Sequence, residues 1–407
     1  MNYSNTLPLL LTPENLASLN HPLPLRGPDY AGLQRLVPGA GQSVDWQRIL
    51  QQLPCLNALQ RTPQDPHYHA EGDVWTHTQM VVEAMQDLED YRQADASRQF
   101  VLFFAALLHD IAKPATTRVD PVSGRIGQPG HSARGAVDAR VLLWRSGVPF
   151  DLRESICRLI AVHQLPFYAL RGNRNGDSAE FIVRKLSHEV DLIELAALAE
   201  ADMRGRHCPD AAEILVDIEL FRELAKEEGC YGQPRAFADA FTRQRYFNGD
   251  DVHPDYVYHC DPGSTVTVLC GLPATGKSSW IAQQCADLPC VGFDDARAAL
   301  KLRHGENDGM AAHFAIDQAK AYLRRKQAFV WNATHLSRQM RSKTLDLLFA
   351  YGASVEVVYL EASEAEIMRR NRNRDTTLTN AGIERMLHRW EVVLPSEAHR
   401  VRYLIQS

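Results

Sequence analysis

Apolar residues recur every three or four positions between about residues 75 and 230. This spacing places apolar side chains on one face of a helix, so it predicts a domain made of helices. We find no convincing alternation of apolar and polar residues in this part of the chain, and therefore expect no strand there. The predicted helices are Trp75–Asp87, Ala94–Ile111, Ala133–Arg145, Leu152–His163, Ala179–Ser187, Leu192–Met203 and Ala211–Glu227.

The hydrophobic pattern changes after residue 231. Residues 232–261 contain Gly, Pro and Asp residues that interrupt regular structure, and they predict a connector. Beyond them, short β-rich runs alternate with helical stretches such as Gly309–Lys326 and Ser337–Tyr351, which predicts a parallel sheet with flanking helices. The predicted strands are Thr265–Cys270, Pro289–Phe293, Ala328–Asn332, Ser354–Leu360 and Val401–Ile405.

These patterns together predict a multi-domain chain in which an all-α domain is followed by an α/β domain. A length of 407 residues fits two or three domains. We expect an N-terminal cap or small subdomain at 1–65, the helical domain at 66–231, the connector at 232–261 and the α/β domain at 262–407. The sequence of residues 1–65 indicates no function.

Composition narrows the class of protein. The net charge of −6 creates no global attraction to nucleic acid, so any such binding must use local basic patches. The eight cysteines form no C-x-x-C pair, which favours free thiols in a reducing compartment over disulfides or a zinc module. Met1–Leu11 has no signal-peptide pattern, and the longest apolar run, Phe100–Leu108, is too short to span a bilayer. We therefore expect a cytoplasmic protein without a membrane partner.

One segment predicts nucleotide binding directly. Gly271–Ser278 reads G-L-P-A-T-G-K-S, which fits the phosphate-binding loop G-x-x-x-x-G-K-[ST], and it lies between a predicted strand and a predicted helix. In such a loop backbone N–H groups surround the phosphates, Lys277 reaches the β- and γ-phosphates, and the Ser278 hydroxyl binds Mg²⁺. The residues expected to bind ATP, or another nucleoside triphosphate, are Gly271, Ala274, Thr275, Gly276, Lys277, Ser278 and Ser279.

Two further features lie beside this loop in the predicted sheet. Asp294 and Arg297 follow the second strand, where a carboxylate can accept the proton of an attacking hydroxyl and an arginine can hold an acceptor phosphate. The alternative is a helix-capping Asp followed by a surface arginine. Residues 369–374 read R-R-N-R-N-R, which is typical of a lid that neutralises transition-state charge, or alternatively of a solvated basic face.

This combination of phosphate loop, Asp-x-x-Arg and Arg-Asn-x-x-Arg resembles the 5′-OH polynucleotide kinase family over about 140 residues. The resemblance implies that Asp294 is the general base and that Arg297 grips the 3′ phosphate of the acceptor nucleotide. It also implies that Arg374, with Arg370 as its partner, contacts the donor phosphates. The third-strand motif departs from the family, because residues 332–334 read N-A-T where many relatives carry D-A-T.

A candidate metal site lies in the helical half. Its members are His77, His109, Asp110, His131, His163 and Asp202. Imidazole and carboxylate ligands together suit a hydrolytic divalent ion such as Mn²⁺, Ni²⁺, Co²⁺, Fe²⁺ or Zn²⁺, which activates water and polarises a phosphoryl oxygen. A lone histidine is more often packed or solvated than a ligand, so only the whole set indicates a site. For His69 and His207 we expect surface or supporting roles.

The order of these residues resembles the HD phosphohydrolase superfamily, an all-helical fold, over roughly residues 70–225. The resemblance implies that His77, His109, Asp110 and Asp202 are the four core ligands. It further implies that His131 and His163 complete a second metal site, so that one or two transition-metal ions bind, and that Lys113 binds a substrate phosphate.

An HD phosphoesterase followed by a P-loop kinase is similar in order to the bacterial HD-domain polynucleotide kinases, which are end-healing enzymes. That resemblance implies phosphorylation of 5′-OH ends and removal of a 2′,3′-cyclic phosphate or 2′-phosphate, with a 3′-phosphate as a further candidate. RNA ends are favoured over DNA ends, and a separate ligase is the expected partner. Two alternatives stay open: a small-molecule kinase fused to a nucleotide phosphohydrolase, and an ATP-driven regulatory module with a nucleotide-sensing HD domain.

Overall fold

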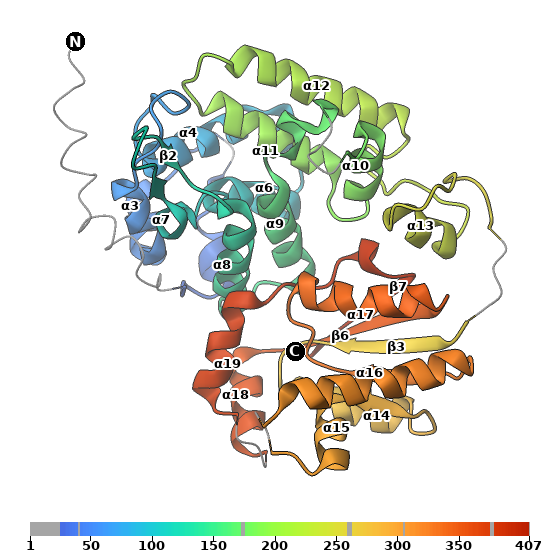
Figure 1. Cartoon of the computed structure of the whole chain (residues 1–407). Helices are drawn as coiled ribbons and strands as arrows, with labels where there is room; N and C mark the ends of the chain where they lie inside the picture. The colour runs from blue at the N-terminus through green and yellow to red at the C-terminus, as the bar shows by residue number, and fades with distance from the viewer. Residues whose placement is uncertain are drawn as a thin grey trace. The chain divides into compact units, whose positions relative to one another are not determined.

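The computed structural model describes residues 25–39, 41–171, 176–258, 263–303, 306–374 and 378–406. The chain forms two compact units, one ending at Arg235 and the other beginning at Ala236 (Figure 1). Residues 1–24 of the expected N-terminal cap and 259–261 of the expected connector lie outside the described residues. No helix in the described ranges is both long and apolar enough to cross a lipid bilayer.

The first unit is helical, as predicted. Its central helix is α6, in which every side chain from Phe100 to Leu108 is buried, and α4, α9 and α11 pack against it. The helices are α2 Tyr30–Gln34, α3 Trp46–Gln52, α4 Val74–Asp87, α5 Glu89–Arg92, α6 Ala96–Leu108, α7 Lys113–Thr116, α8 His131–Arg145, α9 Phe150–Val162, α10 Ala179–Leu186, α11 Leu192–Arg204 and α12 Ala211–Glu227. Three 3₁₀ helices accompany them: η1 Pro54–Arg61, η2 Leu165–Phe167 and η3 Ala169–Arg171.

The expectation that this unit lacks strands was wrong in one place. β1 (Arg118–Val119) pairs antiparallel with β2 (Ile126–Gly127), and Gly124, with φ of 71°, allows the chain to turn between them. Strands of two residues are too short to show an alternating hydrophobic pattern, so the sequence carries no signal for them.

The second unit is built on a parallel sheet, as predicted. The strands lie in the order β4-β5-β3-β6-β7, and every neighbouring pair is parallel. Their bounds are β3 Thr265–Cys270, β4 Cys290–Gly292, β5 Phe329–Asn332, β6 Ser354–Ala362 and β7 Arg400–Gln406. Each lies within two residues of its predicted limits.

Helices cover this sheet on both faces (Figure 1). They are α14 Lys277–Gln284, α15 Phe293–Leu300, α16 Asp308–Arg324, α17 Arg338–Ala350, α18 Glu364–Arg372 and α19 Asn380–Met386, with η4 Leu387–Arg389 and η5 Pro395–Glu397. Leu269, Val330, Val358 and Leu360 form a buried cluster, against which Trp280 and Ile281 of α14 pack. Parallel strands place all their carboxyl ends along one edge, where ligands bind in such sheets.

The segment expected to be a connector also contains a helix, α13 (Ala240–Phe247), which Asp239 caps through its side chain. Arg243 of this helix donates to the carbonyl oxygens of Ala398 and His399 at 3.1 and 2.7 Å. These bonds hold α13 against the segment that leads into β7.

Candidate metal centre and phosphate-binding site

The six predicted metal ligands come together in the helical unit. His77 lies on α4, His109 and Asp110 follow α6, His131 begins α8, His163 follows α9, and Asp202 lies on α11. All six residues are buried, the most exposed being His131 at 8%. Five helices therefore converge on one polar point inside the unit.

Within this cluster the ligand atoms form two groups of three. Those of His77, His109 and Asp202 all lie within 4.8 Å of one another, and the same holds for Asp110, His131 and His163. The groups adjoin, because His109 Nε2 lies 3.1 Å from Asp110 Oδ2 and His163 Nε2 lies 3.8 Å from Asp202 Oδ2. Such a donor set can hold one divalent ion or a pair.

All four histidines of the cluster are oriented by a main-chain carbonyl group. In each of them the Nδ1 nitrogen faces a main-chain carbonyl oxygen: Gly205 O at 3.0 Å from His77, Ala106 O at 2.7 Å from His109, Gln128 O at 2.8 Å from His131 and Ile160 O at 2.8 Å from His163. A carbonyl accepts, so Nδ1 must carry the proton and Nε2 keeps its lone pair. This is the tautomer that a metal ligand needs.

Two acceptors in the cluster make no hydrogen bond with another described residue. They are Oδ1 of Asp110 and Nε2 of His163, and both atoms are buried. Buried acceptors without partners are costly and rare in folded proteins. A bound cation would satisfy them, so the residues fit the metal centre that they were predicted to form.

A lysine and an arginine form ion pairs with the two carboxylates of the cluster. Lys113 Nζ lies 2.7 Å from Asp110 Oδ2 and donates to Gln64 Oε1 at 2.6 Å. Arg206 Nη2 donates to both oxygens of Asp202 at 2.8 Å. Burial acts to raise the pKa of Asp202, but Arg206 and His77 hold it well below its ordinary value.

Arg206 was not among the predicted site residues. It lies four positions after Asp202 and just beyond α11, a spacing that can bring two side chains together but that many unrelated pairs share. Its guanidinium also lies over the ring of Phe167, 5.4 Å from the centroid. Only the fold reveals that it is buried beside the metal ligands.

The phosphate-binding loop in the second unit connects β3 to α14. Gly271 has φ of 133°, and a Cβ atom there would lie 2.2 Å from Leu360 O, so only glycine fits. Gly276 and Ala274 also have positive φ, of 97° and 65°. The loop thus has the turned backbone that points successive N–H groups inward.

The side chains of the loop are arranged for a ligand. Lys277 Nζ donates to the carbonyl oxygens of Gly271 and Leu272 at 2.9 and 2.7 Å. Burial lowers the pKa of Lys277 to about 8, and the positive charge of Arg374 adds to this effect. Ser278 and Ser279 are exposed on the first turn of α14, where their hydroxyls can reach a ligand.

Asp294 and Arg297 lie on one turn of α15. Arg297 Nη2 donates to Asp294 Oδ1 at 3.0 Å; the Asp294 side chain is 84% exposed and that of Arg297 only 14%. The cap position of this helix is Gly292, so the alternative that Asp294 is a helix cap is wrong. The alternative of a surface arginine is equally excluded by its low exposure.

The arginines predicted to form a lid lie on α18 and just after it. Arg370 donates to Gln406 Oε1 at 2.8 Å and to Glu366. Gln406, the last residue of β7, was not predicted to be near the phosphate loop, yet its side-chain amide lies 3.4 Å from where a Cβ of Gly276 would be. α15 follows β4 and α18 follows β6 of the parallel sheet, so Asp294 and Arg370 belong to segments at the same carboxyl edge as the phosphate loop, which follows β3.

Comparisons with known proteins agree with this geometry. The family model of the HD domain matches residues 74–203. That of an AAA domain matches residues 266–393. The chain is a helical HD domain followed by a parallel-sheet, P-loop kinase-like domain. Its kinase-like half implies a nucleotide and Mg²⁺, and its HD half implies a metal-dependent hydrolase.

Individual relatives cover only part of the chain. The multifunctional CCA protein of Xylella fastidiosa (strain M12) is 31% identical over 162 residues, which are 38% of this chain and 35% of that protein. The multifunctional CCA protein of Ralstonia nicotianae (strain ATCC BAA-1114 / GMI1000) is 31% identical over 182 residues, 43% of this chain and 38% of that protein. The chain thus spans little more than a third of these relatives.

Among solved structures, a gluconokinase from Sinorhizobium meliloti 1021 covers 36% of this chain and 84% of its own length. The sequence identity is 17% and the TM-score is 0.26.

Proposed function

We propose that this protein heals broken nucleic-acid ends, with a 5′-OH polynucleotide kinase in its second unit and a 2′,3′-phosphoesterase in its HD domain. The observation that carries the proposal is that α15, with Asp294 and Arg297, follows β4 at the same carboxyl edge of the parallel sheet as the phosphate loop after β3. An exposed carboxylate beside a phosphate loop is placed for an acceptor hydroxyl that arrives from solvent.

In the kinase reaction, Asp294 accepts the proton of the 5′-OH, which attacks the γ-phosphate in line. Lys277, Arg370 and Arg374 stabilise the charge that develops on the phosphoryl oxygens, and Ser278 holds Mg²⁺. Arg297 grips the phosphate that follows the acceptor nucleotide. This last role requires an acceptor that carries a 3′ phosphate, as a nucleic-acid end does and a free nucleoside does not.

In the HD domain, the four histidines and two aspartates hold one or two ions such as Mn²⁺, Ni²⁺ or Co²⁺. When bound, the metal supplies a water acidified for attack and polarises the phosphoryl group. Lys113 binds a phosphate oxygen of the substrate and Arg206 a second one, so that the cyclic phosphodiester is oriented before it is opened. Removal of the resulting 2′-phosphate follows at the same site.

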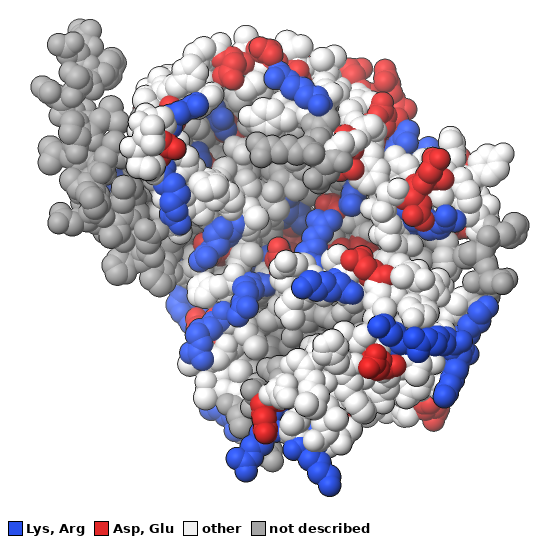
Figure 2. Space-filling model, in the orientation of Figure 1, with Lys and Arg blue, Asp and Glu red and all other residues white. Residues whose placement is uncertain are grey.

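Both sites grip ends, and we propose RNA ends as the principal substrate and a separate ligase as the next enzyme. Figure 2 shows both acidic and basic side chains on the described part of one face, and the net charge of the whole chain is −6. Binding should therefore depend on local phosphate contacts and weaken with salt. The activity of the multifunctional CCA proteins is not carried over, since the chain spans about a third of their length.

The decisive experiment uses γ-labelled ATP and a 5′-OH oligonucleotide that ends in a 2′,3′-cyclic phosphate, as RNA and with a matched DNA carrying a 3′-phosphate. Both ends are analysed with Mg²⁺ alone and with added Mn²⁺. We expect label at the 5′ end and loss of the terminal phosphate at the other. Failure to label any oligonucleotide, with transfer to a nucleoside or sugar instead, would favour the small-molecule kinase.

Variants separate the two sites. Lys277→Ala should abolish 5′ labelling and preserve phosphate removal, and Asp110→Ala should do the reverse. ATP hydrolysis without transfer to any acceptor would support the regulatory alternative. If either variant lost both activities while remaining folded, two independent sites would be the wrong description.

A further inference from the structure

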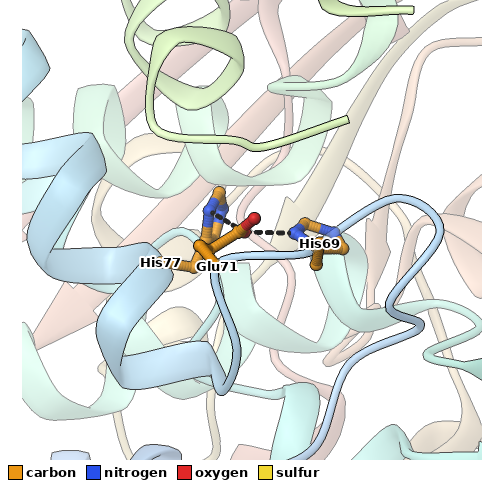
Figure 3. A group of neighbouring side chains, drawn as sticks. All are labelled: His69, Glu71 and His77. Carbon is orange, nitrogen blue, oxygen red and sulfur yellow. Dashed lines mark hydrogen bonds and ion pairs between the residues drawn. The ribbon is translucent and has the colours of Figure 1, made fainter. Parts of the chain in front are cut away.

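A third group of potential ligands lies on the outer side of His77. His69, Glu71 and His77 bring their ligand atoms within 4.8 Å of one another. Figure 3 shows the Glu71 carboxylate between the two imidazoles, with His77 on α4 and the other two residues on the loop that precedes it. The Glu71 side chain is 1% exposed. Neither metal group of the centre includes Glu71.

The contacts of Glu71 engage both carboxylate oxygens. Oε1 lies 2.7 Å from Nδ1 of His69 and 3.1 Å from Nδ1 of His77. Oε2 accepts from the main-chain N–H of His207 at 2.9 Å. Oε1 therefore lies beside two imidazole nitrogens, while Oε2 accepts from a main-chain N–H.

These contacts argue against a separate metal site in this group. An imidazole directs its two nitrogens to opposite sides of the ring, and Nε2 of His77 faces Asp202 Oδ1 at 3.1 Å and His109 Nε2 at 3.3 Å. Its Nδ1 already faces Gly205 O at 3.0 Å and so carries the proton. An ion between His69 and Glu71 would need that proton removed.

We propose that Glu71 is a positioning residue for the metal centre, which flanks the Nδ1–H of His77 together with Gly205 O and so presents Nε2 of that ring to the ion. A carboxylate behind a ligating imidazole fixes the tautomer and makes the metal-facing nitrogen more basic. Among the four histidines of the centre, His77 alone has in these contacts a carboxylate beside Nδ1 in addition to a main-chain carbonyl; for the other three the partner is a carbonyl.

Glu71 also ties together two elements that carry ligands. Through His77 it is joined to α4, and through the N–H of His207 to the segment that follows α11, which bears Asp202. A second bond joins the same segments, since the N–H of Ala70 donates to His207 O at 3.0 Å. His69 completes the arrangement, because its Nδ1 lies 2.7 Å from Glu71 Oε1 and its ring packs against that of His77, with 4.9 Å between the ring centroids.

The test measures metal binding directly and rests on the metal centre of the proposed function. Full-length protein is stripped with a chelator and titrated with Co²⁺, whose visible absorption reports both affinity and stoichiometry. Glu71→Gln and Glu71→Ala should bind Co²⁺ about 10- to 100-fold more weakly, with the larger loss in the alanine variant. Glu83→Gln, at an exposed position on the same helix, should bind within about twofold of the wild type, because Glu83 belongs to none of the ligand groups.

The outcomes separate the possible roles. A Glu71→Gln protein that binds Co²⁺ like the wild type, even if its metal-free form melts earlier, would overturn the proposal and leave Glu71 a purely structural residue. His69→Gln should weaken binding less than Glu71→Gln; loss of one Co²⁺ per chain in that variant would reveal a separate site and equally overturn it. If the wild type binds no Co²⁺, the proposed metal centre fails first.

Discussion

The four histidines of the metal centre each donate one ring proton to the protein itself, and this is a property of single residues in their local backbone. His109 and His163 donate to the carbonyl three positions earlier, Ala106 and Ile160, because each follows the last turn of a helix. The unsatisfied carbonyls of a helix end thus orient the ligand. Because these carbonyls already orient the rings of His109 and His163, we expect neither ring to rotate when an ion binds.

Asp294 is the proposed general base of the kinase reaction. If Asp294 has that role, Asp294→Asn removes the proton acceptor, and kcat should fall by about 10²- to 10⁴-fold. The affinity for ATP should stay within a few-fold of the wild type, since this exposed side chain contacts Arg297 and not the phosphate loop. Steady-state labelling of a 5′-OH RNA, with Asp295→Asn as the matched control, gives both quantities. Equal rates for the two variants would exclude Asp294 as the base.

A titrating residue of the helical unit predicts a pH dependence of stability. Glu194 lines a cavity of about 250 Å³ with Arg158 and Asp191. Burial and the charge of Asp191 raise the pKa of Glu194 to about 7, although Arg98 lies 3.2 Å away and acts in the opposite direction. Because the folded protein holds this proton more tightly, the group stabilises the fold fully below pH 4.5, and that stabilisation is lost as the pH rises through 7.

Glu194→Gln removes this dependence. Relative to the wild type, the free energy of unfolding of the variant should rise between pH 5 and pH 8, by at most about 3 kcal/mol. Arg98 keeps Asp191 as a partner at 3.3 Å, so the variant leaves no isolated charge. Urea unfolding of both proteins at the two pH values measures the difference. A constant difference would mean that Glu194 does not titrate in this range.

At the scale of elements, α4 packs against the end of α11, and this packing sets the position of His77. A Cβ atom on Gly205 would lie 2.7 Å from Val81 N and 2.9 Å from Val81 Cα, so Gly205→Ala must push the backbone of α4 away. The cost is about 1–3 kcal/mol. Since Gly205 O accepts from His77, the shift should weaken Co²⁺ binding as well.

Gly127→Ala is the control for this prediction, because a Cβ atom there meets nothing within 4 Å. Urea unfolding in chelator gives the stability of each variant, and Co²⁺ titration gives its metal affinity. A Gly205→Ala protein with wild-type values in both would mean that α4 and α11 have room to adjust.

The sequence predicted the helices and strands that carry the two sites, but it did not predict the short elements around them. The long buried run of α6 and the five strands of the sheet have strong hydrophobic periodicity, so their limits were predicted to within a few residues. The β1–β2 pair and α13 were missed because they are short and lie among turn-forming residues. The ligands and the phosphate loop followed from residue type and order. Glu71, Arg206 and Gln406 did not, since only tertiary packing brings them to the sites.

On the scale of the whole molecule, each unit has its own hydrophobic core and its own ligands. We therefore expect two unfolding transitions in calorimetry. A ligand at 100 times its Kd stabilises its unit by about 2.7 kcal/mol. Each kcal/mol raises Tm by roughly 2–4 °C at this size.

Adding ATP or removing metal should show which unit unfolds in each transition. ATP with Mg²⁺ should raise only the transition of the second unit, and a chelator without ATP should lower only that of the HD unit. Lys277→Ala should abolish the first shift and Asp110→Ala the second. Equal shifts of both transitions with either ligand would show that the units unfold together.

Because β3 lies at the centre of its sheet, its amide protons should exchange with solvent more slowly than those of the helices around it. Its amides are bonded to β5 on one side and β6 on the other, whereas β4 and β7 are each paired on one side only. Amide protons of β3 should then exchange with solvent deuterium only in global unfolding, and those of α18 in far smaller openings. The phosphate loop follows this central strand directly, so we expect it to keep its shape during openings that free α18 from the rest of the unit.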